Sequence, residues 1–196
     1  IAHEIKNPLT PMRLTTQRLR ERFVDNQSKF AESFMRSSEM ILAEIDRLER
    51  LANAFSSFAR MPVPVLVPLD MREIVRNVGE LFAAEREQGR VEISLPDVPA
   101  PINGDREQLE QALLNLVKNA LEAIDRDKGH VIVTLSTTKT EAIITVVDDG
   151  PGIPEEIRES VFRPYVTSKP GGSGIGLAVV ERVVTDHHGR VRGFNV

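Results

Sequence analysis

The sequence predicts two regions of different fold class (α + α/β): an antiparallel helical hairpin and, after it, an α/β sandwich. Up to Ala59, apolar residues recur at spacings of three, four and seven, as on one side of a helix. Pro62, Pro64 and Pro68 then interrupt any helix and favour an extended chain. Beyond them, alternating segments typical of strands occur between helical segments. We therefore expect a hairpin over residues 1–60, a linker over 61–69 and a second domain over 70–196.

Composition limits the function classes. The 196 residues are 41% hydrophobic and 28% charged, which is ordinary for a globular protein. A formal net charge of −4 gives no reason to expect nucleic acid as a partner. The chain has no cysteine, which excludes disulfides and thiolate metal sites. No apolar run is long enough to span a membrane. Since the chain starts without Met in mid-helix, we expect a cytoplasmic fragment whose membrane anchor, if any, precedes Ile1.

The first region contains two amphipathic helices. One apolar stripe runs from Ile1 to Phe23 and a second from Phe30 to Ala59, and the polar segment Val24–Lys29 between them is typical of a turn. Two helices alone do not enclose a core of this width. We therefore expect the hairpin to dimerise into a four-helix bundle. A purely structural coiled coil would show the same stripes.

The second region is expected to contain one sheet with helices on one face. Asp70 and Glu73 form a possible capping box before a helix that reaches Phe82. Asp105 is a second possible cap. The other expected elements are a strand at 91–95, a helix at 106–124, a strand hairpin at 130–150 that turns at 139–140, helices at 154–161 and 176–188, and a last strand at 191–195. His187 and His188 lie at a helix end, where a donor side chain satisfies the last carbonyls.

The long helix carries the first candidate cluster. Asn115 and Asn119 are four residues apart and share a face of this helix. Two amides in an otherwise apolar helix need hydrogen-bond partners. Such partners could belong to a ligand, to a neighbouring loop or to the sheet.

Two glycine-containing segments form the other clusters. "DDGPGIP" (148–154) directly follows a strand, and Gly150 and Gly152 let the backbone approach a ligand closely. "SKPGGSGIGLAVV" (168–180) leads into a helix whose first N–H groups can bind an anion, with Lys169 close by. Taken singly, the first segment could be a Gly-Pro turn and the second a flexible surface loop. The second is neither a P-loop nor a dinucleotide fingerprint, because it lacks a Gly-Lys-Ser/Thr triplet and comes late in the domain.

In this order the three clusters resemble the Bergerat ATP-binding fold of the GHKL superfamily, which includes histidine kinases, type II topoisomerases, Hsp90 chaperones and MutL proteins. The resemblance implies a layered α/β sandwich that binds ATP and Mg²⁺. It implies that Asn119 ligates Mg²⁺, that Asp148 reads the adenine amine, and that residues 163–172 form a lid anchored by Phe162. The implied ATP-binding residues are Asn115, Lys118, Asn119, Asp148, Gly150, Gly152, Ile153, Phe162, Arg163, Lys169, Gly172, Gly174, Gly176 and Leu177.

The opening stretch "HEIKNPLTP" resembles the phosphoacceptor motif of sensor histidine kinases. The resemblance makes His3 the nucleophile for the γ-phosphoryl group of ATP. Glu4 can accept the proton of the other ring nitrogen and hold the charge of the imidazolium. The resemblance also implies that Asn7, one turn further, positions water for dephosphorylating the partner protein. Pro8 removes a helical hydrogen bond, so we expect a bend there. Without the nucleotide clusters, a hydrogen-bonded histidine of a bundle would be the preferred interpretation of His3.

The motifs together are most similar to the NtrY-type branch of nitrogen-regulation sensor kinases. The implied partners are a second copy of the chain and the receiver domain of a response regulator. A GHKL-type ATPase is an alternative, but such ATPases typically place Glu where this chain has Asn115, and an amide cannot take a proton from water. A dimeric nucleotide-binding scaffold is a second alternative. Some family members carry a cation where this chain has Glu122, so the charge for the phosphates would come from Lys118, Lys169 or Arg163.

Overall fold

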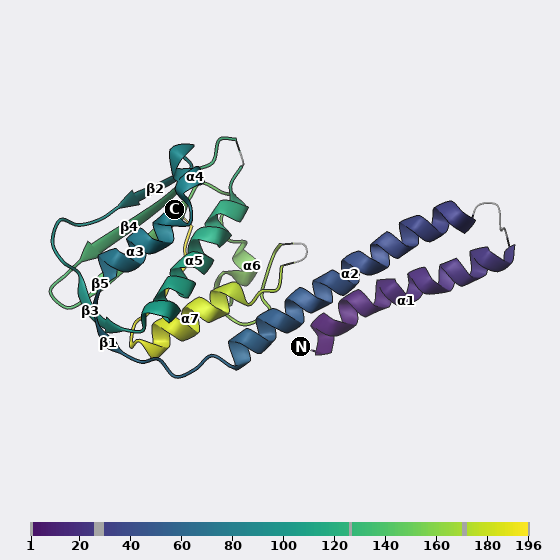
Figure 1. The fold of residues 1–196 in the computed structure, drawn as a ribbon, viewed down its shortest axis with the longest axis horizontal. Coiled ribbons are helices and arrows are strands. Elements are labelled where there is room, and N and C mark those ends of the chain that lie inside the picture. The colour runs from purple at the N-terminus through teal and green to yellow at the C-terminus, as the bar shows by residue number, and fades with distance from the viewer. Residues whose placement is uncertain (1, 26–29, 126, 170–171, 196) are drawn as a thin grey trace. The chain divides into compact units, whose positions relative to one another are not determined.

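The computed structural model describes residues 2–25, 30–125, 127–169 and 172–195 (Figure 1). The chain forms two compact units. The smaller unit comprises Ile1–Met61 together with Lys169–Ser173, and the larger comprises Pro62–Ser168 and Gly174–Val196.

The smaller unit is a hairpin of two long helices, α1 (Ala2–Asp25) and α2 (Phe30–Ala59), which pack against each other. The helical hairpin is confirmed. The turn was expected at Val24–Lys29, but α1 continues to Asp25, so the turn starts later than expected. Residues 26–29 of the expected turn lie outside the described residues. α1 also continues through Pro8 and Pro11, and the bend at Pro8 stays a prediction.

One side of the hairpin is buried and another is exposed. Thr15 and Leu51 are buried, and the hydroxyl of Thr15 lies 3.3 Å from the sulfur of Met40. Large apolar side chains are nevertheless exposed in the single chain, namely Leu9, Leu14, Phe34, Met35, Met40, Leu42 and Ile45. A lone hairpin therefore leaves apolar surface that a second hairpin could cover.

In its described residues the larger unit contains two sheets, so the expectation of one sheet is wrong. β1 (Val67–Asp70) pairs antiparallel with β3 (Pro101–Gly104). In the second sheet β4 (Val131–Thr137) is central, parallel to β2 (Val91–Ser94) and antiparallel to β5 (Ala142–Asp148). β1 and β3 were not expected, because each is four residues long and includes a proline, which is typical of edge strands. The expected strand at 191–195 does not form.

Five helices accompany the sheets in the described part of the larger unit. They are α3 (Met71–Glu80), α4 (Ala83–Glu87), α5 (Arg106–Ala123), α6 (Glu155–Arg158) and α7 (Gly176–Asp186). The expected helix that reaches Phe82 ends earlier, at Glu80, and α4 follows it. α6 and α7 are also shorter than expected, and α5 matches to within one residue.

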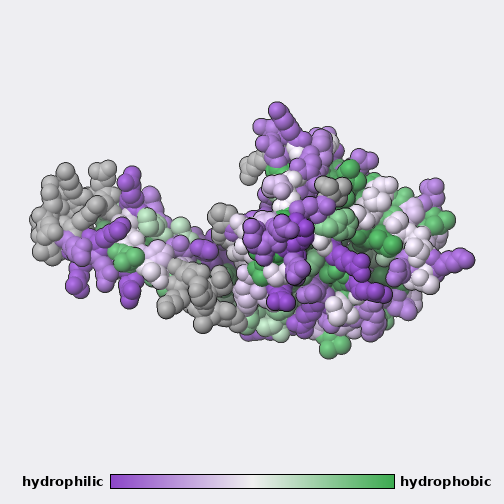
Figure 2. All heavy atoms as spheres, turned by 180° about the vertical axis from the view of Figure 1, so that it is seen from behind, coloured by the Kyte–Doolittle hydropathy of each residue, from purple (hydrophilic) through white to green (hydrophobic). Residues whose placement is uncertain are grey.

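The core lies between the three-stranded sheet and the helices α3, α5 and α7. Alternate residues of β4 are buried (Val131, Val133 and Leu135), and α3 and α5 contact this strand. The other face of the sheet is partly exposed, as at Ile132 and Val147, which pair across β4 and β5. In Figure 2 such apolar side chains lie among hydrophilic ones on the surface of this unit. The α/β sandwich is thus confirmed, with helices packed on one face of the three-stranded sheet.

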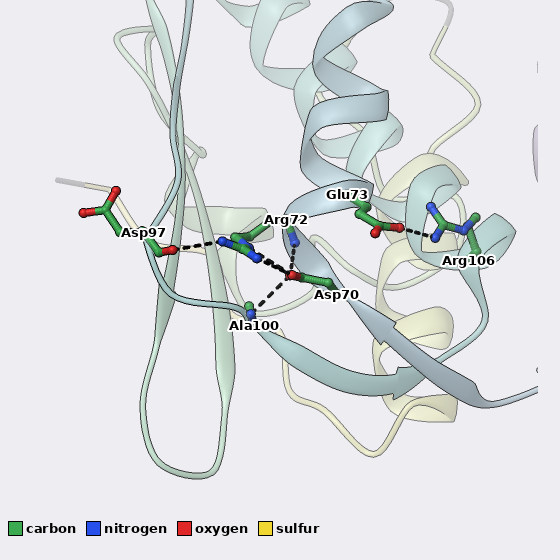
Figure 3. A network of polar contacts seen from close by, with 6 residues as sticks. All are labelled: Asp70, Arg72, Glu73, Asp97, Ala100 and Arg106. Atoms are coloured by element: carbon green, nitrogen blue, oxygen red, sulfur yellow. Dashed lines mark hydrogen bonds and ion pairs between the residues drawn. The ribbon is translucent and has the colours of Figure 1, made fainter.

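A polar network joins the start of α3 to the loop before β3 (Figure 3). The carboxylate of Asp70 accepts hydrogen bonds from the backbone N–H groups of Arg72 and Ala100, at 3.0 and 3.1 Å, and pairs with the guanidinium of Arg72 at 2.7 Å. The cap at Asp70 is therefore confirmed, but the capping box is wrong. Glu73 does not reach back, because it pairs with Arg106 of α5 at 2.6 Å.

Candidate active site

The candidate site is built around α5, which begins at a confirmed cap. Asp105 accepts a hydrogen bond from the backbone N–H of Gln108, at 3.2 Å. Leu109, Leu113 and Val117 are buried and fix which side of the helix faces the core. Asn115 and Asn119 are half-buried on another side, one turn apart.

Both asparagines meet the start of α7. The Nδ2 atom of Asn115 donates to the carbonyl oxygen of Gly176, over 3.3 Å. A Cβ atom at Gly176 would lie 3.5 Å from Nδ2 and 3.9 Å from Oδ1 of Asn119. The two amides expected to share a face therefore do so, and they face the first residue of the helix that follows the second glycine segment.

The "DDGPGIP" loop lies against the other end of α5. A Cβ atom at Gly150 would lie 3.0 Å from the carbonyl oxygen of Ala123, so glycine is required for this approach. Asp148 is exposed, and its Oδ1 atom accepts a hydrogen bond from the N–H of Gly150 at 3.0 Å. The structure thus brings residues of the three sequence clusters together along the C-terminal half of α5.

The start of α7 is suited to an anion. The N-cap residue is Ile175, which is buried and has no side-chain oxygen to accept from the first turn of the helix. The helix has 11 residues, and its dipole adds partial positive charge at Gly176. Just before it, Gly174 has a φ of +64°, and its carbonyl accepts from the N–H of Tyr165 at 2.8 Å. Burial raises the pKa of the Tyr165 phenol.

The other expected site residues differ in exposure and in the unit to which they belong. Phe162 is half-buried next to the buried Val161, whereas Arg163 and Lys118 are exposed. Leu177 is half-buried in the first turn of α7. Lys169 and Gly172 belong to the segment that groups with the smaller unit, and the N–H of Gly172 donates to the carbonyl of Lys169 at 3.1 Å. His3, Glu4 and Asn7 lie in α1, and their side chains are outside the described residues.

Sequence reasoning missed two residues that support the site. Asp149 accepts a hydrogen bond from the backbone N–H of His130, at 2.9 Å, and so ties the end of β5 to the residue before β4. Asn195 makes two hydrogen bonds with Ile153, in the first glycine loop. Asp149 could have been found from the sequence, because it directly follows the predicted site residue Asp148. No pattern in the sequence indicates Asn195, which lies 42 residues after Ile153.

His187 has a double role at the end of α7. Its Nδ1 atom lies 2.7 Å from the carbonyl of Val183, which confirms the expected interaction with a terminal carbonyl. Its Nε2 atom accepts from the N–H of Asp105 at 2.8 Å, so Nδ1 carries the proton and donates. α7 is therefore attached to α5 at both ends, through His187 and through Gly176.

No group of three or more His, Cys, Asp or Glu side chains that could hold a metal ion occurs among the described residues. A magnesium ion bound together with phosphates needs fewer protein ligands, because Mg²⁺ keeps several waters and takes phosphate oxygens. The amide oxygen of Asn119, beside the start of α7, is a hard donor of the kind that Mg²⁺ prefers. This donor set fits one protein ligand to a phosphate-bound Mg²⁺.

Two family models match the chain. Residues 1–62 match the His Kinase A (phospho-acceptor) domain. Residues 104–193 match the family described as histidine kinase-, DNA gyrase B-, and HSP90-like ATPase. None of the helices in the described ranges is long and apolar enough to cross a membrane.

Individual proteins show the same similarity. The nitrogen regulation protein NtrY of Azorhizobium caulinodans is 37% identical over 198 residues, which cover 97% of this chain and 25% of NtrY. The chain thus spans about a quarter of the length of that relative. The histidine kinase ThkA, solved in complex with the response regulator protein TrrA, is 27% identical with a TM-score of 0.65, over 96% of this chain and 53% of that one.

A mycobacterial sensor histidine kinase, MprB, is 34% identical with a TM-score of 0.53. The match covers 63% of this chain and 81% of the MprB chain. Together with the two family models, this similarity shows that the chain belongs to the sensor histidine kinase family.

Proposed function

We propose that the chain is the cytoplasmic catalytic core of a two-component sensor kinase, which transfers the γ-phosphoryl group of ATP to His3. One observation supports this most directly. α5 carries Asn115 and Asn119 and contacts both glycine segments, at Gly150 and at Gly176. In this proposal residues 1–60 form the dimerisation and phosphoacceptor hairpin, 61–69 the linker and 70–196 the ATP-binding domain.

The larger unit would bind and orient the nucleotide. The carboxylate of Asp148 would accept a hydrogen bond from the adenine amine, and Gly150 and Gly152 would let the loop approach the base. The first turn of α7, without a side-chain cap, donates to phosphate oxygens. Asn119 would hold Mg²⁺, which neutralises charge on the phosphates. Ile153, Phe162 and Leu177 would contact the nucleotide, and Lys118, Arg163 and Gly174 would lie near its phosphates. Lys169 and Gly172, which group with the smaller unit, would belong to the lid segment.

The smaller unit would supply the nucleophile. The unprotonated ring nitrogen of His3 attacks the γ-phosphorus, a P–N bond forms, the bond to the bridging oxygen breaks, and ADP leaves with that electron pair. Glu4 accepts the proton on the other ring nitrogen as positive charge develops on the ring. The phosphoryl group then passes to an aspartate of a response-regulator receiver domain. Asn7 would position water for the opposing reaction, the dephosphorylation of that receiver domain.

The proposed partners are a second copy of the chain and the receiver domain. The exposed apolar side chains of the hairpin, such as Leu14 and Leu42, support dimerisation into a four-helix bundle. ATP and receiver domains occur in the cytoplasm, where we place this part of the protein.

The proposal is tested by incubating the chain with γ-labelled ATP and Mg²⁺ and examining the acid lability of the label. We expect an acid-labile, base-stable phosphohistidine that is absent from His3→Ala, while His3→Ala still binds ATP. Free labelled phosphate without labelled protein would indicate an ATPase. ATP binding with neither product would indicate a scaffold, and label on His3→Ala would move the acceptor to another histidine.

A further inference from the structure

Asn195 forms a two-point contact with the first glycine loop. Its Oδ1 atom accepts from the backbone N–H of Ile153 at 2.8 Å, and its Nδ2 atom donates to the carbonyl oxygen of Ile153 at 3.0 Å. The two bonds also define the orientation of the amide, since the reverse orientation would place oxygen against oxygen. A single side chain, 42 residues further along the chain, thus satisfies both backbone groups of one loop residue.

The glycines on either side of this contact show how closely residues 193–195 approach the loop of Gly152. Gly152 has a φ of +76°, and a Cβ atom there would lie 2.9 Å from the amide carbon of Asn195. A Cβ atom at Gly193 would lie 3.2 Å from Cδ1 of Ile153 and 3.6 Å from Cε2 of Phe162. Residues 193–195 therefore lie against both the loop of Gly152 and the side chain of Phe162, before the proposed lid.

We infer that Asn195 is a positioning residue for nucleotide binding, which holds the loop 150–153 in the conformation that receives the base. The inference rests on the proposed function, because that loop is the proposed base-binding loop. The segment 193–195 forms no strand, so side-chain hydrogen bonds take the place of strand pairing as its link to the loop. Asn195 itself does not touch the nucleotide in this inference.

The physical argument concerns the freedom of the loop. A segment with two glycines loses more backbone entropy on ordering than one without them. Asp148 and Gly152 are exposed, so little burial restrains this loop. Two hydrogen bonds from Asn195 fix Ile153 before the ligand arrives, and a preorganised loop binds more tightly because less ordering accompanies binding. Loss of both bonds should weaken ATP binding about 5- to 30-fold.

The test uses three variants of Asn195 in the whole chain. Asn195→Ala removes both bonds, and Asn195→Leu removes both while keeping a side chain of similar size. Asn195→Asp keeps the acceptor but sets a carboxylate oxygen against the carbonyl of Ile153. Asn77→Ala is the matched control, because Asn77 is also an exposed asparagine with a side-chain hydrogen bond, to Glu110 at 2.8 Å, but lies away from the loop.

The measurements are the Kd for a non-hydrolysable ATP analogue by calorimetry and the kcat and KM of autophosphorylation, at a temperature where every variant is folded. We expect all three Asn195 variants to raise Kd and KM by a similar factor, with kcat at saturating ATP unchanged and Asn77→Ala like the parent. An unchanged Kd would overturn the inference, as would a rise shared with Asn77→Ala or a fall confined to kcat. Asp148→Asn is measured in parallel: if it too leaves Kd unchanged, the assignment of the base-binding loop has failed, whereas if it alone raises Kd, only the role of Asn195 has failed.

Discussion

Asn115 of α5 donates a hydrogen bond to the carbonyl oxygen of Gly176, the first residue of α7, over 3.3 Å. This bond uses the Nδ2 group of the amide, while the Oδ1 atom accepts from Gln111 at 3.2 Å. An amide that is held in this way cannot act as a general base toward water. The finding supports a site for phosphoryl transfer to a protein group over a site for ATP hydrolysis.

Asn119 is expected to be the protein ligand of Mg²⁺. Asn119→Ala removes a hard oxygen donor from a coordination sphere that contains few protein atoms. We expect the Mg²⁺ concentration for half-maximal autophosphorylation to rise about 10-fold or more, with part of the activity restored by excess Mg²⁺. A Mg²⁺ titration at saturating ATP measures this, with Asn77→Ala as the control. An unchanged half-maximal Mg²⁺ concentration would exclude Asn119 as a ligand.

Asp148 is expected to discriminate adenine from guanine. In Asp148→Asn, the adenine amine can face a donor instead of a carboxylate acceptor, and a buried mispairing costs about 1–3 kcal/mol. ATP affinity should fall roughly 5- to 150-fold, while GTP binding should change little, since GTP lacks that amine. Competition binding with both nucleotides makes the comparison.

The adjacent aspartate provides the control for this prediction. Asp149 uses its Oδ1 atom to accept from the N–H of His130, and Asn at this position can still accept that bond. Asp149→Asn should therefore keep ATP affinity near that of the parent chain. Equal losses for ATP and GTP in Asp148→Asn would instead mean that Asp148 supports the loop through its bond to Gly150.

Asp70 is expected to contribute pH-dependent stability. The Arg72 guanidinium, followed by the N–H groups of Arg72 and Ala100, holds the pKa of the Asp70 carboxyl well below its usual range. Because the folded pKa is the lower one, this contribution is fully present above the unfolded pKa of about 3.9 and is lost as pH falls toward the folded pKa. Asp70→Ala should cost about 1–2 kcal/mol of unfolding free energy at pH 7, and less at pH values below about 4.

Denaturant unfolding at several pH values measures this difference, and Asp97→Ala is the control. Asp97 belongs to the same network only through its backbone carbonyl, which accepts from Arg72 at 3.0 Å, and its carboxylate points away from Arg72 in Figure 3. Asp97→Ala should therefore show no such pH dependence. If the Asp70→Ala difference were constant from pH 7 down to acid, the carboxylate charge would not be its source.

Local signals were enough to predict much of this molecule. The long periodic segments predicted α1, α2 and α5 because each carries apolar residues at helical spacing over several turns. Asp70 and Asp105 predicted helix starts, since a cap involves only the next few residues. Similarly, the glycines that predicted the site are required by close backbone approach, as at Gly150.

The features that were missed depend on residues far apart in sequence. β1 and β3 are only four residues long, and each is defined by its pairing with the other, although α3, α4 and β2 lie between them in the sequence. Glu73 had a local partner available but pairs with Arg106 instead. The expected strand at 191–195 does not form, and Asn195 instead bonds to Ile153 with its side chain, a contact that an alternating pattern does not reveal.

Glu4 and Asn7 are expected to separate two activities of one helix turn. Both lie in α1, Glu4 next to His3 and Asn7 one turn after it. A neighbour at i+1 and an amide at i+4 do not both contact the same ring nitrogen. Glu4→Gln should slow autophosphorylation about 100- to 10,000-fold, since it removes help with the ring proton. Asn7→Ala should keep far more autophosphorylation and chiefly impair dephosphorylation of a phosphorylated receiver domain, because an amide takes no proton but can position water.

The measurement compares both rates in both variants, with one receiver domain that the parent chain phosphorylates. Glutamine keeps the size of Glu4 but not its charge, so a change in autophosphorylation reports the loss of the carboxylate. Glu4→Gln should move the ratio of autophosphorylation to dephosphorylation down, and Asn7→Ala should move it up. If both variants lower the two rates in the same proportion, the turn acts as a single positioning unit, and neither residue has an activity of its own.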